Sequence, residues 1–145
     1  MKTFVVDSSV CLKWVLDDEI DTEPAKELQK RYLNEEINLI APDLWFYEIL
    51  NILKSTKLRK PSIPNKSLET RLLDLLQSSP SLIDMSELGP QCLKYAINLG
   101  ITAYDSAYIT LAHAHGFTLI TADNKLASKI NNPELVISLK DIKIN

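Results

Sequence analysis

The feature that most constrains the fold is an alternation, along the whole chain, of short apolar runs with longer segments of helical periodicity. Several of the runs are rich in β-branched residues, which is typical of strands that are buried on both faces. The runs lie at 3–7, 38–41, 82–84, 117–121 and 135–137. Strands that alternate with helices predict a mostly parallel sheet covered on both faces, so we expect a three-layer α/β/α sandwich.

Residues that start and stop helices separate these runs. Five acids at 17–23 lead to Pro24, which suits the first turn of a helix that continues to about residue 35. The other expected helices span about 43–59, a segment after Pro64, the interval from Gly89 to Gly100, the interval from Thr102 to Gly116, and 123–130. A chain of 145 residues has the length of about one average domain, so we expect a single domain over residues 1–145.

Glycine and cysteine usage excludes several kinds of site. The three glycines are too far apart in the sequence for a Walker A loop or a G-x-G-x-x-G loop. Cys11 and Cys92 occur singly in apolar periodic segments, so we expect both to be reduced core residues. The apolar runs are far shorter than the ~20 residues of a membrane span, and no signal-peptide pattern follows Met1. We therefore expect a soluble, cytoplasmic protein without a membrane partner.

Two carboxylates follow expected strands directly. Asp7 ends the first strand, and Asp123 comes two residues after the strand at 117–121, where a helix begins. In an open parallel sheet, ligands bind at the carboxyl ends of the strands, so acids in these positions are candidate ligand-binding groups. Taken alone, each is more simply explained as a helix N-cap that accepts backbone N–H bonds.

Two further acids lie in apolar helices. Glu48 and Asn51 are the polar members of the apolar window 44–53, which predicts a helix buried over most of its circumference. An ionised carboxylate in such a place needs an ion partner or a metal, although a narrow solvent-facing stripe would also accommodate it. Asp105 lies in the first turn of a helix expected to bury Tyr104 and Tyr108, where the helix dipole alone would favour an anion.

Four carboxylates gathered at one sheet edge would repel one another and raise each other's pKa values. A divalent cation resolves this repulsion. Mg²⁺ or Mn²⁺ prefers oxygen ligands, and the sequence contains no Cys/His cluster suited to zinc. The acids Asp7, Glu48, Asp105 and Asp123 therefore predict a magnesium or manganese site.

Four segments, in their order along the chain, resemble the PIN domain family. In its length and in its first residues, the chain looks most like the VapC toxins of that family. The segments are Phe4-Val5-Val6-Asp7-Ser8-Ser9-Val10, 42–48, Ala103-Tyr104-Asp105-Ser106-Ala107-Tyr108 and Leu119-Ile120-Thr121-Ala122-Asp123. The resemblance implies a PIN-like fold and places Asp7, Glu48, Asp105 and Asp123 at the catalytic metal-site positions. Thr121 matches the family's hydroxyl before the last acid, Ser9 follows where small or hydroxyl residues are frequent, and Asn124 stands where some members have a further acid.

The resemblance also implies an activity and partners. Expected are Mg²⁺- or Mn²⁺-dependent hydrolysis of RNA phosphodiester bonds, inhibition by a cognate antitoxin protein, and a homodimer. Residues 54–71 carry six basic side chains against Glu69, although the formal net charge is −3. We hypothesise that Lys54, Lys57, Arg59 and Lys60 guide RNA towards Glu48, against the plainer interpretation of a solvated face.

Other candidate residues and other classes of protein fit the sequence less well than a PIN-like nuclease. On a helix His113 and His115 point about 200° apart and cannot share a metal, so we expect His115 to be partly buried and His113 exposed. Trp14, Trp45 and Tyr47 fit core or dimer contacts better than base stacking. A receiver domain would need a late strand ending in Lys, and a haloacid-dehalogenase-type phosphatase would need Asp-x-Asp at residue 7. An inert PIN-like binding module would lack carboxylates that are present here.

Overall fold

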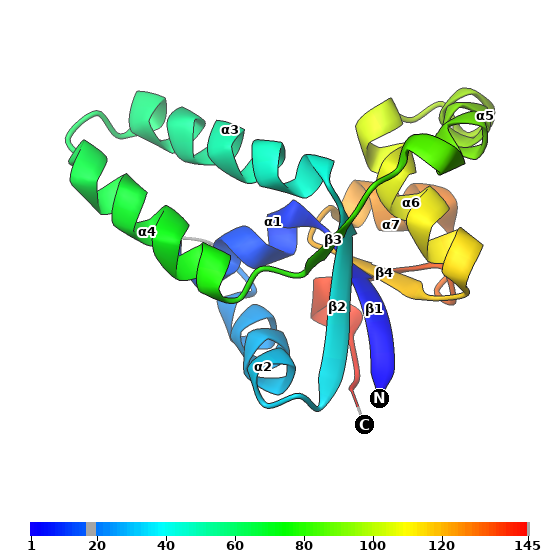
Figure 1. Ribbon diagram of the computed structural model, residues 1–145, viewed down its shortest axis with the longest axis horizontal. Helices are drawn as coiled ribbons and strands as arrows, with labels where there is room; N and C mark the ends of the chain where they lie inside the picture. Colours follow the sequence, from blue (N-terminus) through cyan, green and yellow to red (C-terminus); the bar gives the residue numbers. More distant parts are fainter. Residues whose placement is uncertain (17–19, 145) are drawn as a thin grey trace.

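The centre of the fold is a five-stranded sheet in which all strands are parallel, in the order β3-β2-β1-β4-β5 (Figure 1). The computed structural model describes residues 1–16 and 20–144. The strands are β1 (Lys2–Val6), β2 (Ile37–Pro42), β3 (Ser81–Ile83), β4 (Thr118–Thr121) and β5 (Val136–Ser138). The expected three-layer α/β/α sandwich with its parallel sheet is confirmed.

Helices cover both faces of this sheet. Helix α2 packs beside β2 on one face, whereas α6 lies across β1, β2 and β4 on the other, with α5 against it (Figure 1). The helices in the described residues are α1 (Ser8–Cys11), α2 (Thr22–Leu33), α3 (Leu44–Arg59), α4 (Asn65–Gln77), α5 (Gly89–Leu99), α6 (Ala103–His115) and α7 (Asn124–Ile130), with short 3₁₀ turns at Leu12–Trp14, Ser86–Leu88 and Leu139–Asp141.

The helix boundaries follow the capping residues in the sequence. The Thr102 hydroxyl accepts the backbone N–H of Asp105 at the start of α6. Gly116 ends the same helix at φ 67°, a left-handed conformation that a side chain would strain. Gly100 ends α5 in the same way at φ 61°. These predicted boundaries are confirmed.

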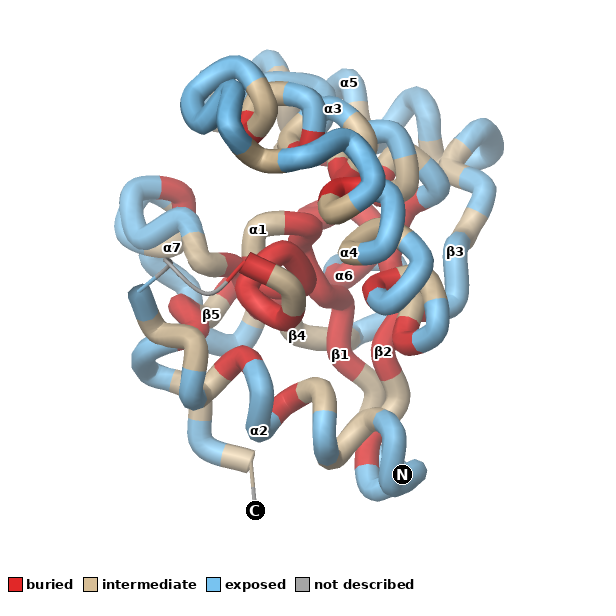
Figure 2. The backbone as a smooth tube through the Cα atoms, turned by 90° about the vertical axis from the view of Figure 1, so that its left-hand side faces the viewer, coloured by how far each residue is buried: buried red, intermediate tan, exposed pale blue. Residues whose placement is uncertain are grey.

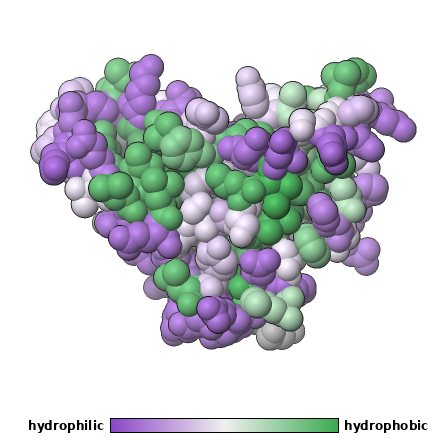
Figure 3. Space-filling view, viewed as in Figure 1, coloured by the Kyte–Doolittle hydropathy of each residue, from purple (hydrophilic) through white to green (hydrophobic). Residues whose placement is uncertain are grey.

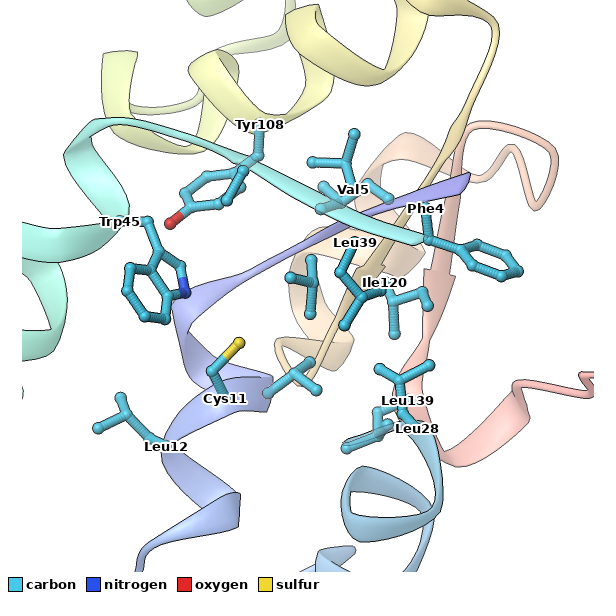
Figure 4. Close-up of a cluster of buried hydrophobic side chains, with 14 of the residues drawn as sticks. Phe4, Val5, Cys11, Leu12, Leu28, Leu39, Trp45, Tyr108, Ile120 and Leu139 are labelled. Atoms are coloured by element: carbon cyan, nitrogen blue, oxygen red, sulfur yellow. The ribbon is translucent and has the colours of Figure 1, made fainter. Parts of the chain in front are cut away.

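The core lies between the sheet and the helices, and the central strands are its most buried part (Figure 2). The Cys11 thiol lies beside the Trp45 indole in this core (Figure 4). Burial raises the pKa of Cys11 well above its usual range, so this thiol is protonated and unreactive at neutral pH. Both cysteines are free, as expected, but the prediction that Cys92 belongs to the core is wrong, because it is only half-buried on α5.

Three further expectations about burial differ from the structure. Helix α3 fully buries one stripe of Trp45, Ile49, Leu53 and Thr56, because it projects from the sheet paired with α4. Leu44, Phe46 and Ile52 beside this stripe are only half-buried against the core, so the expected burial over most of the circumference is met only in part. Tyr104 is 66 % exposed, since it lies in the first turn of α6 before that helix reaches the sheet.

The third concerns His115, which is exposed like His113, because it occupies the last turn of α6, where its ring stacks on Phe117. Part of the acidic stretch at 17–23 lies outside the described residues. Within the described part of the chain, no helix is long and apolar enough to cross a membrane.

Candidate active site

The candidate site lies where the direction of strand order changes. From β1, the chain moves first to β2 and β3 on one side and later to β4 and β5 on the other. Such a switch point leaves a crevice at the carboxyl ends of the two strands, which is where ligands bind in open α/β sheets. Asp7 follows β1 and donates its backbone N–H to the Ile120 carbonyl of β4 at 3.0 Å. The first predicted acid therefore lies at this crevice.

Asp7 is a buried carboxylate, 9 % exposed, held by hydroxyl groups. Thr121 Oγ1 donates to Asp7 Oδ2 at 2.8 Å, and Ser8 Oγ lies 3.2 Å from Asp7 Oδ1. The Ser9 backbone N–H also donates to Oδ1, at 3.4 Å. Burial raises the pKa of Asp7, and these hydrogen bonds offset only part of the rise. The fold thus holds in place a carboxylate that is costly to ionise.

Glu48 reaches the same place from α3. Its Oε1 accepts the Tyr108 hydroxyl of α6 at 2.6 Å and lies 3.3 Å from Ser8 Oγ. The single Ser8 hydroxyl hydrogen is therefore shared between two carboxylates, Asp7 and Glu48. Burial raises the pKa of Glu48, and the negative charges of Asp7 and Asp105 raise it further. Glu48 is thus a partner of the cluster rather than part of a solvent-facing stripe.

Asp105 is half-buried in the first turn of α6. Burial is the main cause of its raised pKa, and the negative charges of Asp7 and Asp123 add to it. Since the favourable field of the helix N-terminus would lower this pKa, the rise indicates that repulsion and desolvation outweigh it. Asp105 therefore links Asp7 electrostatically to Asp123.

Asp123 combines the two roles that the sequence allowed. Its Oδ1 caps α7 by accepting the backbone N–H groups of Lys125 at 3.0 Å and Leu126 at 3.1 Å. Its own backbone N–H donates to Thr121 Oγ1 at 3.0 Å, so Thr121 joins Asp123 to Asp7. The Asp123 side chain is exposed at the sheet edge, and its negative charge contributes to the raised pKa of Asp105.

The supporting residues divide into two groups. Ser9 Oγ accepts the Ala122 backbone N–H at 3.1 Å and so joins the loops after β1 and β4. Asn124 instead accepts the Ser138 hydroxyl of β5 through its side-chain oxygen. The side chains of Ser8 and Tyr108 donate hydrogen bonds to Glu48, and the sequence alone did not predict these contacts. Tyr108 lies one helical turn after Asp105, and this spacing is the signal that could have identified it.

Comparison with known proteins identifies the family. A family model described as the PIN domain matches residues 4–131. The chain belongs to the PIN domain family. The crystal structure of PAE2754 from Pyrobaculum aerophilum is similar over 96 % of this chain and 92 % of that chain, with a TM-score of 0.69 and 22 % sequence identity. A search of the curated proteins finds no match.

PIN domains are generally nucleases that act on phosphodiester bonds, and they typically use divalent metal ions. Within residues 1–16 and 20–144, no three His, Cys, Asp or Glu side chains form a ready-made metal cage. The donor chemistry nevertheless fits such an ion, because Asp7, Glu48 and Asp105 are oxygen donors whose mutual repulsion a cation would relieve. Mg²⁺ usually keeps several waters and needs only one or two protein carboxylates, so a converged cage is not required.

The basic residues of segment 54–71 lie on α3, on α4 and in the loop between these helices. Lys57 Nζ donates to the carbonyl oxygens of Pro61 at 2.8 Å and Ile63 at 2.6 Å, and an Arg59 Nη donates to the Thr56 hydroxyl at 3.2 Å. Lys54 is exposed on the same helix. Lys57 and Arg59 therefore take part in local structure in addition to contributing positive charge.

Replacing Lys57 by methionine should lower the free energy of unfolding by about 1 kcal/mol. The thioether side chain keeps the apolar stem but loses both hydrogen bonds to the loop carbonyls. Urea unfolding followed by circular dichroism measures the effect. Lys54→Met is the matched control on the same helix, and equal stability losses in the two variants would contradict this role for Lys57.

Proposed function

We propose that the chain is a Mg²⁺- or Mn²⁺-dependent endoribonuclease of the VapC toxin type. One observation carries the proposal: at the carboxyl ends of β1 and β4, the Ser8 hydroxyl lies 3.2 Å from the buried Asp7 and 3.3 Å from Glu48. Burial and neighbouring negative charges also raise the pKa values of Glu48 and Asp105. Clustered carboxylates of perturbed pKa in a crevice are a mark of a functional site. Uncharged side chains at these positions would make the metal-free protein more stable, so the presence of carboxylates here favours a functional role over a structural one.

Each acid has a distinct part in the proposed site. Asp7, Glu48 and Asp105, with Asp123 at the rim, would hold the divalent ion. When bound, that ion would supply positive charge to the scissile phosphate and Lewis acidity to activate water. Thr121 fixes the orientation of the Asp7 carboxylate, and Tyr108 fixes that of Glu48. No side-chain nucleophile is needed for this hydrolysis.

The proposed substrate is single-stranded or loop RNA, because an unpaired chain can bring its backbone to a partly recessed site. The basic side chains of Lys54, Lys57, Arg59 and Lys60 would attract it. A cognate antitoxin protein and a second copy of the chain are the other proposed partners. Leu93 and Ile97 support the homodimer, because both are large apolar side chains left 60 % and 70 % exposed on α5.

Incubation of the purified protein with total RNA and Mg²⁺ or Mn²⁺ tests the proposal, with Asp105→Asn as the control. Cleavage by the natural chain, its loss with EDTA and its loss in the variant are expected. Absence of cleavage under all these conditions would contradict the proposal. RNA binding without cleavage would indicate a PIN-like binding module instead.

Replacing Thr121 by valine should lower kcat/KM for RNA cleavage by roughly 10- to 100-fold, the range for residues that orient metal-binding side chains. Valine keeps the shape of this fully buried residue but neither donates to Asp7 nor accepts from the Asp123 backbone. Thr121→Ser keeps the hydroxyl and should retain most of the activity. A valine variant as active as the natural chain, or a serine variant as poor as valine, would contradict this role.

A further inference from the structure

Two exposed tyrosines flank the carboxylate cluster without belonging to it. Tyr47 immediately precedes Glu48 on α3, and Tyr104 immediately precedes Asp105 on α6. Their side chains are 71 % and 66 % exposed. Exposing a large aromatic ring forgoes the stabilisation that its burial would give, and here two are left exposed next to the same site.

The two tyrosines line one hollow together. It has a volume of about 320 Å³ and is lined by Leu44, Tyr47, Glu48, Asn51 and Tyr104. The hollow therefore lies between α3 and α6, and Glu48 belongs both to its lining and to the carboxylate cluster. The surface is notched between the part of the molecule built on α3 and α4 and the part built on α5 and α6 (Figure 3). Whatever occupies the hollow therefore lies beside Glu48, one of the acids proposed to hold the metal ion.

The lining has the chemistry of a nucleobase site. Flat aromatic faces stack on any base, and the Asn51 amide offers both a donor and an acceptor to a base edge. Phe46 and Tyr47 pack edge-to-face, with ring centroids 5.5 Å apart and the planes at 74°, so the Tyr47 ring has a neighbour that limits its rotation. The volume lies near the lower end of the range for small-ligand pockets, which is about 300–1,000 Å³.

We infer that Tyr47 and Tyr104 form a stacking subsite for one unpaired base of the RNA, next to the scissile phosphate. The inference rests on the proposed nuclease function and adds a residue-level contact that would select the single-stranded substrate proposed there. Bases of a duplex have both faces covered by their neighbours, so only an unpaired base can present a face to the two rings. Stacking is tolerant of sequence, so the subsite selects unpaired structure more than base identity.

The test uses single-stranded RNA that carries the fluorescent base 2-aminopurine, which is quenched when it stacks. The Asp7→Asn background keeps the RNA intact, so binding is measured whether or not the natural chain is a nuclease. We expect quenching on binding. Tyr47→Ala and Tyr104→Ala should each abolish it and weaken the affinity roughly 5- to 150-fold, the range for loss of one base–aromatic stack.

Matched variants separate stacking from other effects. Tyr47→Phe and Tyr104→Phe keep the ring and should retain quenching and affinity. Leu58→Ala is the control for an exposed apolar residue, because Leu58 is 71 % exposed on α3, about three turns beyond Tyr47 and outside the hollow. Unchanged quenching and affinity in both alanine variants would overturn the subsite.

The outcomes also distinguish the subsite from the nuclease proposal. If the natural chain cleaves RNA and the alanine variants cleave it with unchanged KM, the subsite is wrong and the nuclease stands. If the natural chain cleaves nothing but quenching still depends on the two rings, the nuclease is wrong and the base site stands. If a second copy of the chain covers the tyrosines, Tyr47→Ala will elute as a smaller species than the natural chain with no quenching in either, which overturns the subsite.

Discussion

Replacing Asp7 by asparagine should abolish RNA cleavage while leaving the metal-free protein folded and more stable than the natural chain. The loss of kcat/KM should reach roughly three orders of magnitude or more, as for single groups that act directly in other hydrolases. Asp7 is the most buried acid of the cluster, and the asparagine amide cannot supply its negative charge to a cation. Cleavage of labelled RNA under single-turnover conditions measures the loss.

The gain in stability has the same origin as the loss of activity. Burial raises the pKa of Asp7, so its ionised form opposes folding at neutral pH. Asparagine removes that charge and can still accept from the Ser9 backbone while its amide nitrogen donates to Thr121 Oγ1. A rise of a few degrees in Tm is expected in EDTA.

A matched control separates this effect from a general change of net charge. Asp74 is an exposed carboxylate on α4, outside the cluster, so Asp74→Asn should change neither cleavage nor Tm in EDTA. Full cleavage by Asp7→Asn, or a fall in its Tm accompanied by loss of structure, would show that Asp7 serves the fold rather than the reaction.

Most of the secondary structure was predictable because local chemistry determines it. Pro24, Pro64, Gly100 and Gly116 mark where helices begin or end whatever the tertiary context. The parallel sheet followed from the alternation of strand runs with helices. The burial of α3 was not predictable in the same way, because an apolar run does not reveal that its helix projects from the sheet.

The acids of the site were predictable, but their surroundings were not. Asp7 and Asp123 follow strands, and this position alone brings them to one sheet edge. The bond from Tyr108 to Glu48 joins residues 60 positions apart, and it depends on how α6 packs beside α3. The exposure of Tyr104 likewise depends on where α6 reaches the sheet. Contacts of this kind arise from packing, which periodicity does not encode.

The stability of the metal-free protein should fall as the pH rises above about 4, the pKa range of carboxylates in the unfolded chain. Asp7, Glu48 and Asp105 all have pKa values raised above those of the unfolded chain, so the folded state binds more protons in the interval between the two sets of values. The stabilisation that protonation gives is fully present below the unfolded pKa values and is lost as the pH passes the folded ones. Each proton held preferentially by the folded state contributes a slope of up to about 1.4 kcal/mol per pH unit.

Divalent metal should reverse this dependence, because a cation binds the deprotonated carboxylates and competes with protons. Thermal unfolding of the natural chain and of Asp7→Asn, each with EDTA or with Mg²⁺ across this pH range, measures both effects. We expect the Mg²⁺-induced rise in Tm to grow with pH in the natural chain, and the slope in EDTA to be shallower in the variant. A natural chain whose stability in EDTA rises with pH, or a variant with the same slope, would mean that these carboxylates carry no folding cost. The cluster would then hold no destabilising negative charge for a cation to neutralise. This one titration therefore tests the electrostatic basis of the proposed site independently of any cleavage assay.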